Sequence, residues 1–183
     1  SALALNNGTI KDAAGNAATL ALASPGATNS LGANKALIVD TTVPTISSVN
    51  STASNGTFKI DDVIPIKITF SEAVTVSGTP QLTLETGTSD AVVNYASGSG
   101  SIDLIFNYTV ASTHVSSDLD YKATNSLALN SGSINDAAGN AATLTLASPG
   151  ATNSLSANKA LVIDGVVATV ASVTSTVSDD TYK

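Results

Sequence analysis

The stretch VIPIKITF, residues 63–70, decides the fold class of this chain. Apolar side chains occupy every second position in it, at Ile64, Ile66, Ile68 and Phe70. Alternation with a period of two, built from β-branched and aromatic residues, predicts a half-buried β-strand. Pro65 falls on the opposite face, which predicts that this strand lies near a sheet edge or begins irregularly.

Outward from this stretch, the sequence predicts further short strands joined by polar turns. They cover residues 45–49, 73–76, 81–85, 91–95, 102–110, 127–129 and 160–163. The Ala-rich stretch after Asp136 is interpreted as a turn at 136–140 followed by a short strand, because Gly139 and Asn140 disfavour a helix. Seven or more short strands with turns between them predict an all-β fold, most simply an immunoglobulin-like (Ig-like) β-sandwich.

A long segment of the sequence occurs twice. Residues 2–59 align with residues 126–183 at a constant offset of 124 positions, and 40 of the 58 pairs are identical. A period this long fits one whole domain rather than one turn of a solenoid. We therefore expect tandem repeats, with 1–43 as the C-terminal part of a preceding Ig-like repeat, 44–164 as a complete repeat and 165–183 as the first strand of the following repeat.

The chain is thus expected to hold about one and a half copies from a longer tandem protein. Residues 1–43 would lack the strands that complete their sheet. We expect them to be weakly ordered in isolation, or to be completed by another chain.

The composition excludes several classes of function. Seven Lys and no Arg oppose fourteen acidic residues, giving a net charge of −7, so we expect no nucleic-acid partner. The absence of Cys excludes disulfides and thiol chemistry. There is no run of about 20 apolar residues, so no membrane insertion is expected.

The sequence predicts that the protein is not an enzyme. His114 is the single His, it lies in a polar stretch, and no Gly-x-Ser-x-Gly nucleophile motif accompanies it. Glu72 and Glu85 are the two Glu residues, and they lack the aromatic neighbours that would hold a sugar between a pair of catalytic carboxylates.

Four stretches carry a resemblance to a known family: VDTTVPTISSVNS (39–51), GTFKIDDVIPIKITFSEAVTVSGTPQLTLET (56–86), DLDY (118–121) and NDAAGNAATL (135–144). The chain resembles, over essentially its whole length, the tandem bacterial Ig-like repeats of very large secreted cell-surface proteins, including adhesin-like and swimming-motility-associated proteins. The resemblance implies an Ig-like β-sandwich, an extracellular location at the bacterial cell surface, a structural or adhesive role, and calcium at or near domain junctions. One departure is that Pro44 of the linker becomes Ala168 in the second copy.

Ig topology predicts a calcium site at one pole of the complete repeat. The linker enters there with Asp40, a strand ends there at Glu72, and the turn from Asp136 to Asn140 lies there as well. We expect Asp40, Glu72, Asp136 and Asn140 to converge, which suits a cation that takes 6–8 oxygen ligands. The alternative is that Asp136 and Asn140 only close a tight turn.

The opposite pole gathers a second set of acids, namely Asp61, Asp62, Asp118 and Asp120. Solvated surface charge is the preferred interpretation of this set, with a second metal site as the alternative. In the second copy Asp179 and Asp180 replace Asn55 and Gly56, so the number of acids in this loop differs between the copies. This difference favours the interpretation of these acids as solvated surface charge. Tyr121 lies where a tyrosine corner is expected and is interpreted as structural.

These observations favour a structural spacer, whose partners are neighbouring repeats of the same protein. Such a repeat would extend a stalk with calcium-stiffened junctions, in adhesion or biofilm. One alternative is a self-assembling subunit of an extracellular filament or sheath, joined to other copies by strand complementation. Another is an adhesive module that binds a carbohydrate or a host protein, which the few aromatic residues support weakly.

Overall fold

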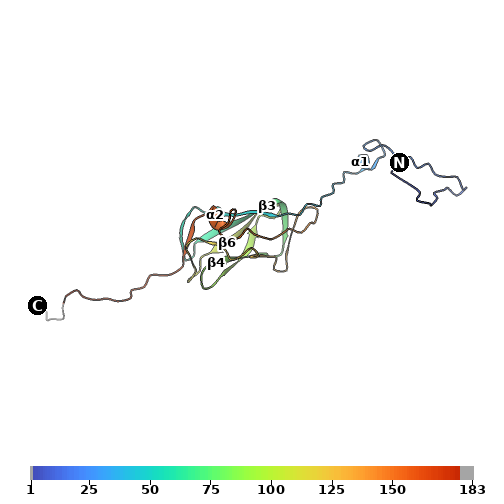
Figure 1. Ribbon diagram of the computed structural model, residues 1–183. Helices are drawn as coiled ribbons and strands as arrows, with labels where there is room; N and C mark the ends of the chain where they lie inside the picture. Colours follow the sequence, from blue (N-terminus) through green and yellow to red (C-terminus); the bar gives the residue numbers. More distant parts are fainter. Residues whose placement is uncertain (1, 178–183) are drawn as a thin grey trace. The chain divides into compact units, whose positions relative to one another are not determined.

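The computed structural model of the chain describes residues 2–177. The chain divides into two compact units, Ser1–Asp40 and Thr41–Lys183 (Figure 1). Part of the strand predicted at 165–183, namely 178–183 with Asp179 and Asp180, lies outside the described residues. Residues 165–177 carry no strand and are almost entirely exposed.

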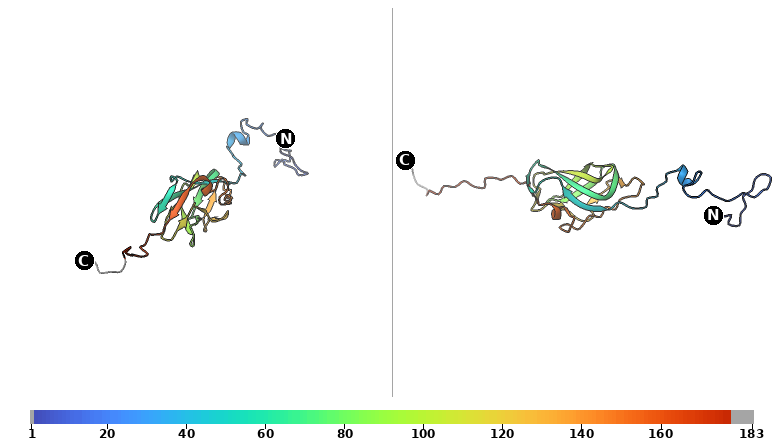
Figure 2. Two further views of the ribbon diagram at one scale, coloured as in Figure 1. Left: turned by 60° about the vertical axis from the view of Figure 1, so that its left-hand side comes forward. Right: turned by 90° about the horizontal axis from the view of Figure 1, so that it is seen from above.

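The second unit is built from a large antiparallel sheet that curls on itself (Figure 2). Its strands follow the order β1 (Ile46–Ser51), β3 (Val63–Ser77), β6 (Ser101–Thr109), β5 (Ala91–Ser97), β4 (Gln81–Glu85) and β8 (Asp120–Tyr121). Two short strands join it from the side: β10 (Ser133–Asn135) pairs with β3, and β9 (Leu127–Ala128) pairs with β4. The prediction of an all-β fold is confirmed.

A smaller sheet holds three strands, β2 (Gly56–Lys59), β11 (Leu161–Asp164) and β7 (Val115–Ser116). Strand β11 lies in the middle, antiparallel to β7 and parallel to β2. The parallel pairing joins residues far apart in the sequence, with Leu161 opposite Gly56.

Strand β3 is the longest strand of the large sheet, and it confirms the strand predicted at 63–70. Ile64, Ile66 and Ile68 are fully buried, as alternation requires. The strand pairs with β1 on one side and with β6 on the other. β3 continues to Ser77, so the prediction of a separate strand at 73–76 is wrong. The register of β3 against β6 shifts between Thr69 and Val74.

The segment after β10 differs in part from the expectation. A turn forms at 136–140 as predicted, but the short strand expected after it is wrong, because only isolated bridges occur at Ala141 and Thr143. A short helix, α2 (Leu155–Asn158), precedes β11. Ser154 caps this helix, with its hydroxyl accepting from the backbone N–H of Ala157 at 3.2 Å.

Two tyrosines lie fully buried in the core. The hydroxyl of Tyr108 hydrogen-bonds to Nδ1 of His114 at 3.0 Å, and the two rings stack. The hydroxyl of Tyr121 donates to the carbonyl oxygen of Ala147 at 2.6 Å. Tyr121 is therefore structural, but its partner lies 26 residues downstream, whereas a tyrosine corner bonds a few residues upstream. Burial raises the pKa of each tyrosine to about 12.

The first unit carries much less regular structure. Within residues 2–40 the regular elements are the helix α1 (Leu31–Asn34) and one isolated bridge between Lys11 and Ala17. Apolar side chains such as Ile10, Leu22 and Leu37 are exposed. Their counterparts in the repeated sequence, Ile134, Leu146 and Leu161, belong to the core of the second unit.

Candidate metal centre

Three of the four predicted ligands come together around the irregular part of β3. Glu72 lies inside β3, between the residues where its register against β6 shifts. The expectation that the strand ends at Glu72 is wrong; the sheet continues past it. Strand β10 pairs with the far end of β3, Asn135 opposite Thr75, and so carries the following residue, Asp136, towards Glu72.

Asp40 directly precedes the second unit. The chain after it is held beside Glu72, because Ser71 N–H donates to Thr45 O at 2.8 Å and Thr45 N–H donates to Ser71 Oγ at 3.0 Å. Backbone pairing thus brings the linker, β3 and the turn after β10 to the same place. The three elements are those that the sequence predicted, although one of them continues rather than ending there.

One carboxylate oxygen each from Asp40, Glu72 and Asp136 lies within 4.8 Å of the other two. Two oxygens bound to one Ca²⁺ at about 2.4 Å can be at most about 4.8 Å apart, so this spacing is compatible with a shared cation. Asp136 is buried, and Oε1 of Glu72 has less than 1 Å² exposed. Carboxylate oxygens are the donors that hard cations prefer.

Asn140 joins this group through Asp136. Its backbone N–H donates to Oδ1 of Asp136 at 2.8 Å, and its Nδ2 donates to Oδ2 at 2.7 Å. The turn-closing role foreseen for these two residues is therefore present. Both oxygens of the Asp136 carboxylate are thus held in place by Asn140.

The electrostatics keep Asp136 charged. Desolvation by burial acts to raise its pKa, but hydrogen bonds from the side chain and backbone of Asn140, and from the backbone N–H groups of Gly139 and Ala138, together lower the pKa below its ordinary value. Asp136 is therefore ionised at neutral pH, as a cation ligand must be.

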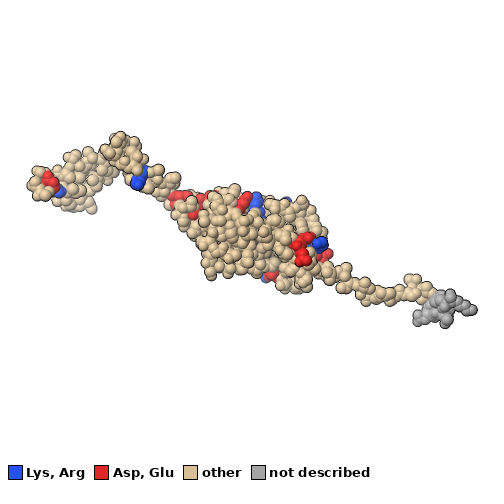
Figure 3. All heavy atoms as spheres, turned by 180° about the vertical axis from the view of Figure 1, so that it is seen from behind, with Lys and Arg blue, Asp and Glu red and all other residues tan. Residues whose placement is uncertain are grey.

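Three of the four acids of the opposite pole take structural roles instead. Oδ2 of Asp120 accepts from Gly150 N–H at 2.9 Å and from Ser156 Oγ at 2.7 Å, which ties the loop before α2 to β8. Asp118 accepts from Leu161 N–H, and Asp62 pairs with Lys59. Over residues 2–177, the one acidic group with metal-ligand spacing is that of Asp40, Glu72 and Asp136. Figure 3 shows acidic side chains concentrated at the two ends of the second unit.

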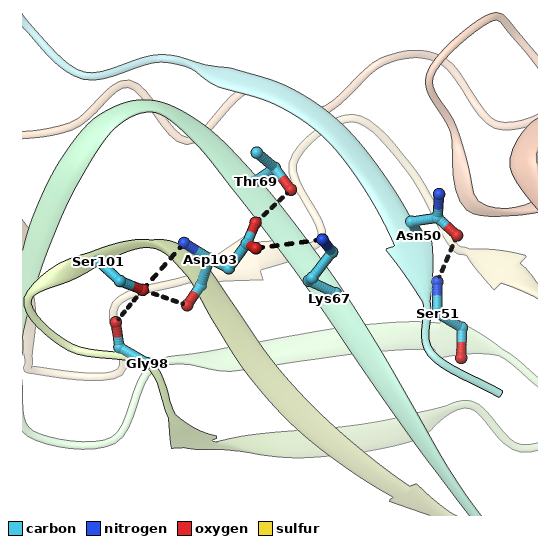
Figure 4. A network of polar contacts seen from close by, with 7 residues as sticks. All are labelled: Asn50, Ser51, Lys67, Thr69, Gly98, Ser101 and Asp103. Atoms are coloured by element: carbon cyan, nitrogen blue, oxygen red, sulfur yellow. Dashed lines mark hydrogen bonds and ion pairs between the residues drawn. The ribbon is translucent and has the colours of Figure 1, made fainter.

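A separate charged network crosses the pair of β3 and β6 (Figure 4). Oδ1 of Asp103 accepts from Thr69 Oγ1 at 2.6 Å, and its Oδ2 pairs with Lys67 Nζ at 3.1 Å. The Thr69 hydroxyl and then Lys67 hold the pKa of Asp103 below its ordinary value, against the opposing effect of burial. Sequence reasoning did not connect these residues, because only the strand register places Thr69 opposite Asp103.

Comparison of the chain with protein-family models, curated proteins and solved structures gives no match. In the part of the chain that the structure describes, no helix has the length and hydrophobicity needed to cross a membrane. The repeated sequence and the geometry of the acidic group are the features of the chain that bear on its function.

Proposed function

We propose that the chain is a structural spacer, an Ig-like β-sandwich repeat of a large bacterial cell-surface protein. The repeated sequence supports this proposal. A structural domain that lengthens a stalk is expected to occur many times in the same protein, whereas a specialised binding domain need not occur more than once. The all-β fold with its curled antiparallel sheet is compatible with a sandwich. Neighbouring repeats of the same protein are the proposed partners.

The single observation that carries the proposal is the inclusion of Asp40 in the acidic group. Asp40 belongs to the stretch that leads into the second unit, whereas Glu72 and Asp136 belong to the sheet and its turn. A cation bound by all three would fix the incoming chain to β3. A stalk made of such repeats would then resist bending where each repeat begins.

Calcium is the proposed cation. Ca²⁺ accepts irregular sets of 6–8 oxygens, whereas Mg²⁺ demands near-ideal octahedral geometry and gives up its waters reluctantly. The proposed ligands are Asp40, Glu72 and Asp136, with Asn140 orienting Asp136. The bound charge would also offset the repulsion among three carboxylates that lie this close together.

Thermal unfolding in EDTA, in millimolar calcium and in millimolar magnesium tests the proposal. Ligand that binds the native state raises its stability by RT ln(1 + [L]/Kd), so the melting temperature should rise with calcium. Glu72→Gln keeps the size of the side chain and removes a charge, and it should abolish most of the rise.

The repeat supplies a matched control for Asp136. Asp136→Ala should abolish the calcium response, whereas Asp12→Ala, which removes the equivalent turn-closing carboxylate of the first copy, should leave it unchanged. A melting temperature that is the same in EDTA and in calcium would refute the calcium-stiffened spacer.

A further inference from the structure

The chain enters and leaves the second unit at opposite ends of β3. At the entry, the backbone of Thr45 is hydrogen-bonded to Ser71, beside the irregular part of β3. At the exit, Asp164 lies opposite Lys59, and a short turn leads from Lys59 into the start of β3. The stretch of β3 from Val63 to Ser71 is about 26 Å long at roughly 3.3 Å per residue. Tension in the chain therefore pulls these two ends apart along the strand.

Strand β1, the first strand after the entry, is held on both of its edges. One edge pairs with β3 along the strand, with one irregularity after Ile46. The other edge meets residues 143–159, which come much later in the sequence. Val49 N–H donates to Asn153 O at 2.9 Å, and Asn158 Nδ2 donates to Val49 O at 2.8 Å. Strand β1 therefore cannot slide along its own axis without breaking bonds on both sides.

Residues 143–159 run in the same direction as β1. Before β1 begins, Thr143 N–H donates to Pro44 O at 2.8 Å, and the isolated bridge at Thr143 is parallel. After β1 ends, Lys159 Nζ donates to Ala53 O at 2.8 Å. Both stretches thus run from the entry towards the exit. We call β1 together with residues 143–159 the clamp.

Force applied through the chain pulls the two parts of the clamp in opposite directions. The chain before β1 pulls it back towards the entry, whereas β11 pulls residues 143–159 towards the exit. In an antiparallel pair such as β1 with β3, the hydrogen bonds are perpendicular to the strands, so a pull along the strand strains them all together. We propose that the second unit resists tension, with its clamp strained in shear. This inference rests on the proposed spacer role, because a stalk is where such resistance is of use.

Strand β11, the last strand before the exit, is also held on both of its edges, by β2 and by β7. Gly165 directly after it is bonded in both directions: its N–H donates to His114 O at 2.8 Å, and Thr113 N–H donates to its carbonyl oxygen at 3.0 Å. A Cβ at Gly165 would lie 2.3 Å from Ala111 O, so only glycine allows this close approach. A pull at the exit therefore also acts along a strand that is bonded on both sides.

The acidic group lies at the entry end of the clamp. Asp40 precedes β1, and Asp136 belongs to the turn that leads into residues 143–159. A cation bound by both would add one more link between the same two stretches of chain. The clamp itself consists of hydrogen bonds that need no cation. Its resistance can therefore be measured in EDTA, separately from any response to calcium.

The first test pulls single molecules of the full chain in two directions with optical tweezers, in EDTA. The chain has no Cys, so introduced cysteines are the only attachment points for the handles. Thr41→Cys with Val166→Cys, at two exposed positions, strains the clamp in shear. Thr41→Cys with Ala73→Cys, also exposed, pulls β1 and β3 apart from the same end and opens their hydrogen bonds one after another.

At a given force, the folded state should last at least about a hundredfold longer in the shear direction, because three or more hydrogen bonds, each changing the rate about fivefold, must break together. The rate of forced unfolding is the quantity that such bonds control. The two variants should melt at the same temperature without handles, which shows that direction and not stability sets the difference. Equal lifetimes in the two directions overturn the proposal.

A second test locates the resistance within the unit. Asn158→Ala removes the amide bond to Val49 O inside the clamp, whereas Gln81→Ala removes an amide bond to Asn94 Oδ1, between β4 and β5 and outside the clamp. Pulled in the shear direction, Asn158→Ala should unfold about fivefold faster at a given force, and Gln81→Ala should unfold at the unmodified rate. Equal acceleration by both variants, or acceleration by neither, overturns the proposal.

The chain also offers controls for Asn158. Asn34 is its counterpart in the first copy and ends α1 as Asn158 ends α2, so Asn34→Ala should leave the lifetime under force unchanged. Asn158→Asp keeps the shape of the side chain but cannot donate to Val49 O, so it should accelerate unfolding at least as much as Asn158→Ala. An Asn158→Asp variant that unfolds at the unmodified rate contradicts the role of this bond in the clamp.

The outcomes separate this inference from the proposed function. A melting temperature that rises with calcium, together with equal lifetimes in the two pulling directions, would support the calcium-stiffened spacer and overturn the clamp. A lifetime that depends on direction in EDTA, together with no response to calcium, would support the clamp and overturn the calcium-stiffened spacer.

Discussion

The two copies of the repeated segment separate the structure that a sequence forms by itself from the structure that requires a partner. Turn and helix occur in both copies: Asp12 and Asp136 each accept from the Asn four residues later, and Ser30 and Ser154 each cap a helical turn. The strands occur in one copy alone among residues 2–177, as β9, β10 and β11. A turn closes its hydrogen bonds locally, whereas a strand must find a second strand.

The largest expected difference between the copies concerns their buried leucines. Leu161→Ala should lower the free energy of unfolding by about 3 kcal/mol, since truncation of a buried Leu removes apolar contact and leaves a cavity. Leu37→Ala, the same change in the first copy, should alter it by less than about 0.5 kcal/mol. Urea unfolding followed by circular dichroism measures both. Equal losses would mean that the first copy is packed in solution as the second one is.

Alkaline pH should act on the second unit alone. The pKa of Tyr121 and of Tyr108 is raised to about 12 from 10, whereas residues 2–40 hold no Tyr. The stability that comes from keeping each tyrosine neutral is complete below pH 10 and is lost as the pH rises towards 12. Each pKa unit corresponds to about 1.4 kcal/mol, so the loss per tyrosine is about 3 kcal/mol or less.

The measurement for this prediction is the free energy of unfolding at pH 9, 10 and 11, with Tyr121→Phe for comparison. The variant loses the bond to Ala147 and is less stable at pH 9, but its stability should fall less steeply with pH. A slope equal to that of the unmodified chain would contradict the assignment.

Helix caps provide a finer comparison. Ser154→Ala should cost about 1 kcal/mol of stability, because α2 is anchored in the core through the fully buried Leu155, whereas Leu31 of α1 is 69 % exposed. Ser30→Ala removes the same cap from α1 and should leave the cooperative transition unchanged. A loss of cooperative stability in Ser30→Ala would show that α1 is coupled to the second unit.

The smallest effect is expected at acidic pH from the network on β3 and β6. The lowered pKa of Asp103 means that its contribution is present above about pH 4 and is lost as the pH falls through the folded-state value. Because the pair with Lys67 is partly exposed, Lys67→Ala should cost well under about 1 kcal/mol at neutral pH. In acid-titrated urea unfolding, the difference from the unmodified chain should shrink as the pH falls through the folded-state pKa of Asp103, and a difference that does not change with pH would contradict the role of the charge.

Patterns that depend on neighbours in the sequence were predictable. Alternation at Ile64, Ile66 and Ile68 identified the central strand, and Gly139 with Asn140 identified the turn. The gathering of Asp40, Glu72 and Asp136 was also expected, from the order of strands that an Ig-like sandwich would have. Each of these depends on a local period or on a known order of strands.

Features set by distant pairing were not predictable. The parallel pair of β11 with β2 and the anchoring of the α2 loop by Asp120 require a register that the local sequence does not contain. The continuation of β3 past Glu72 depends on β10, which supplies a partner at Thr75. The stacking of His114 on Tyr108 likewise follows from the fold and not from the spacing of the two residues.

The central place of β11 in the small sheet has a consequence for the time course of folding. Its neighbour β2 precedes it by about 100 residues, and pairings across such separations form slowly. During synthesis from the N-terminus, β2 emerges first, and its edge stays unpaired until β11 has been made. A protein built from such units would pass through one vulnerable interval for every repeat that it adds.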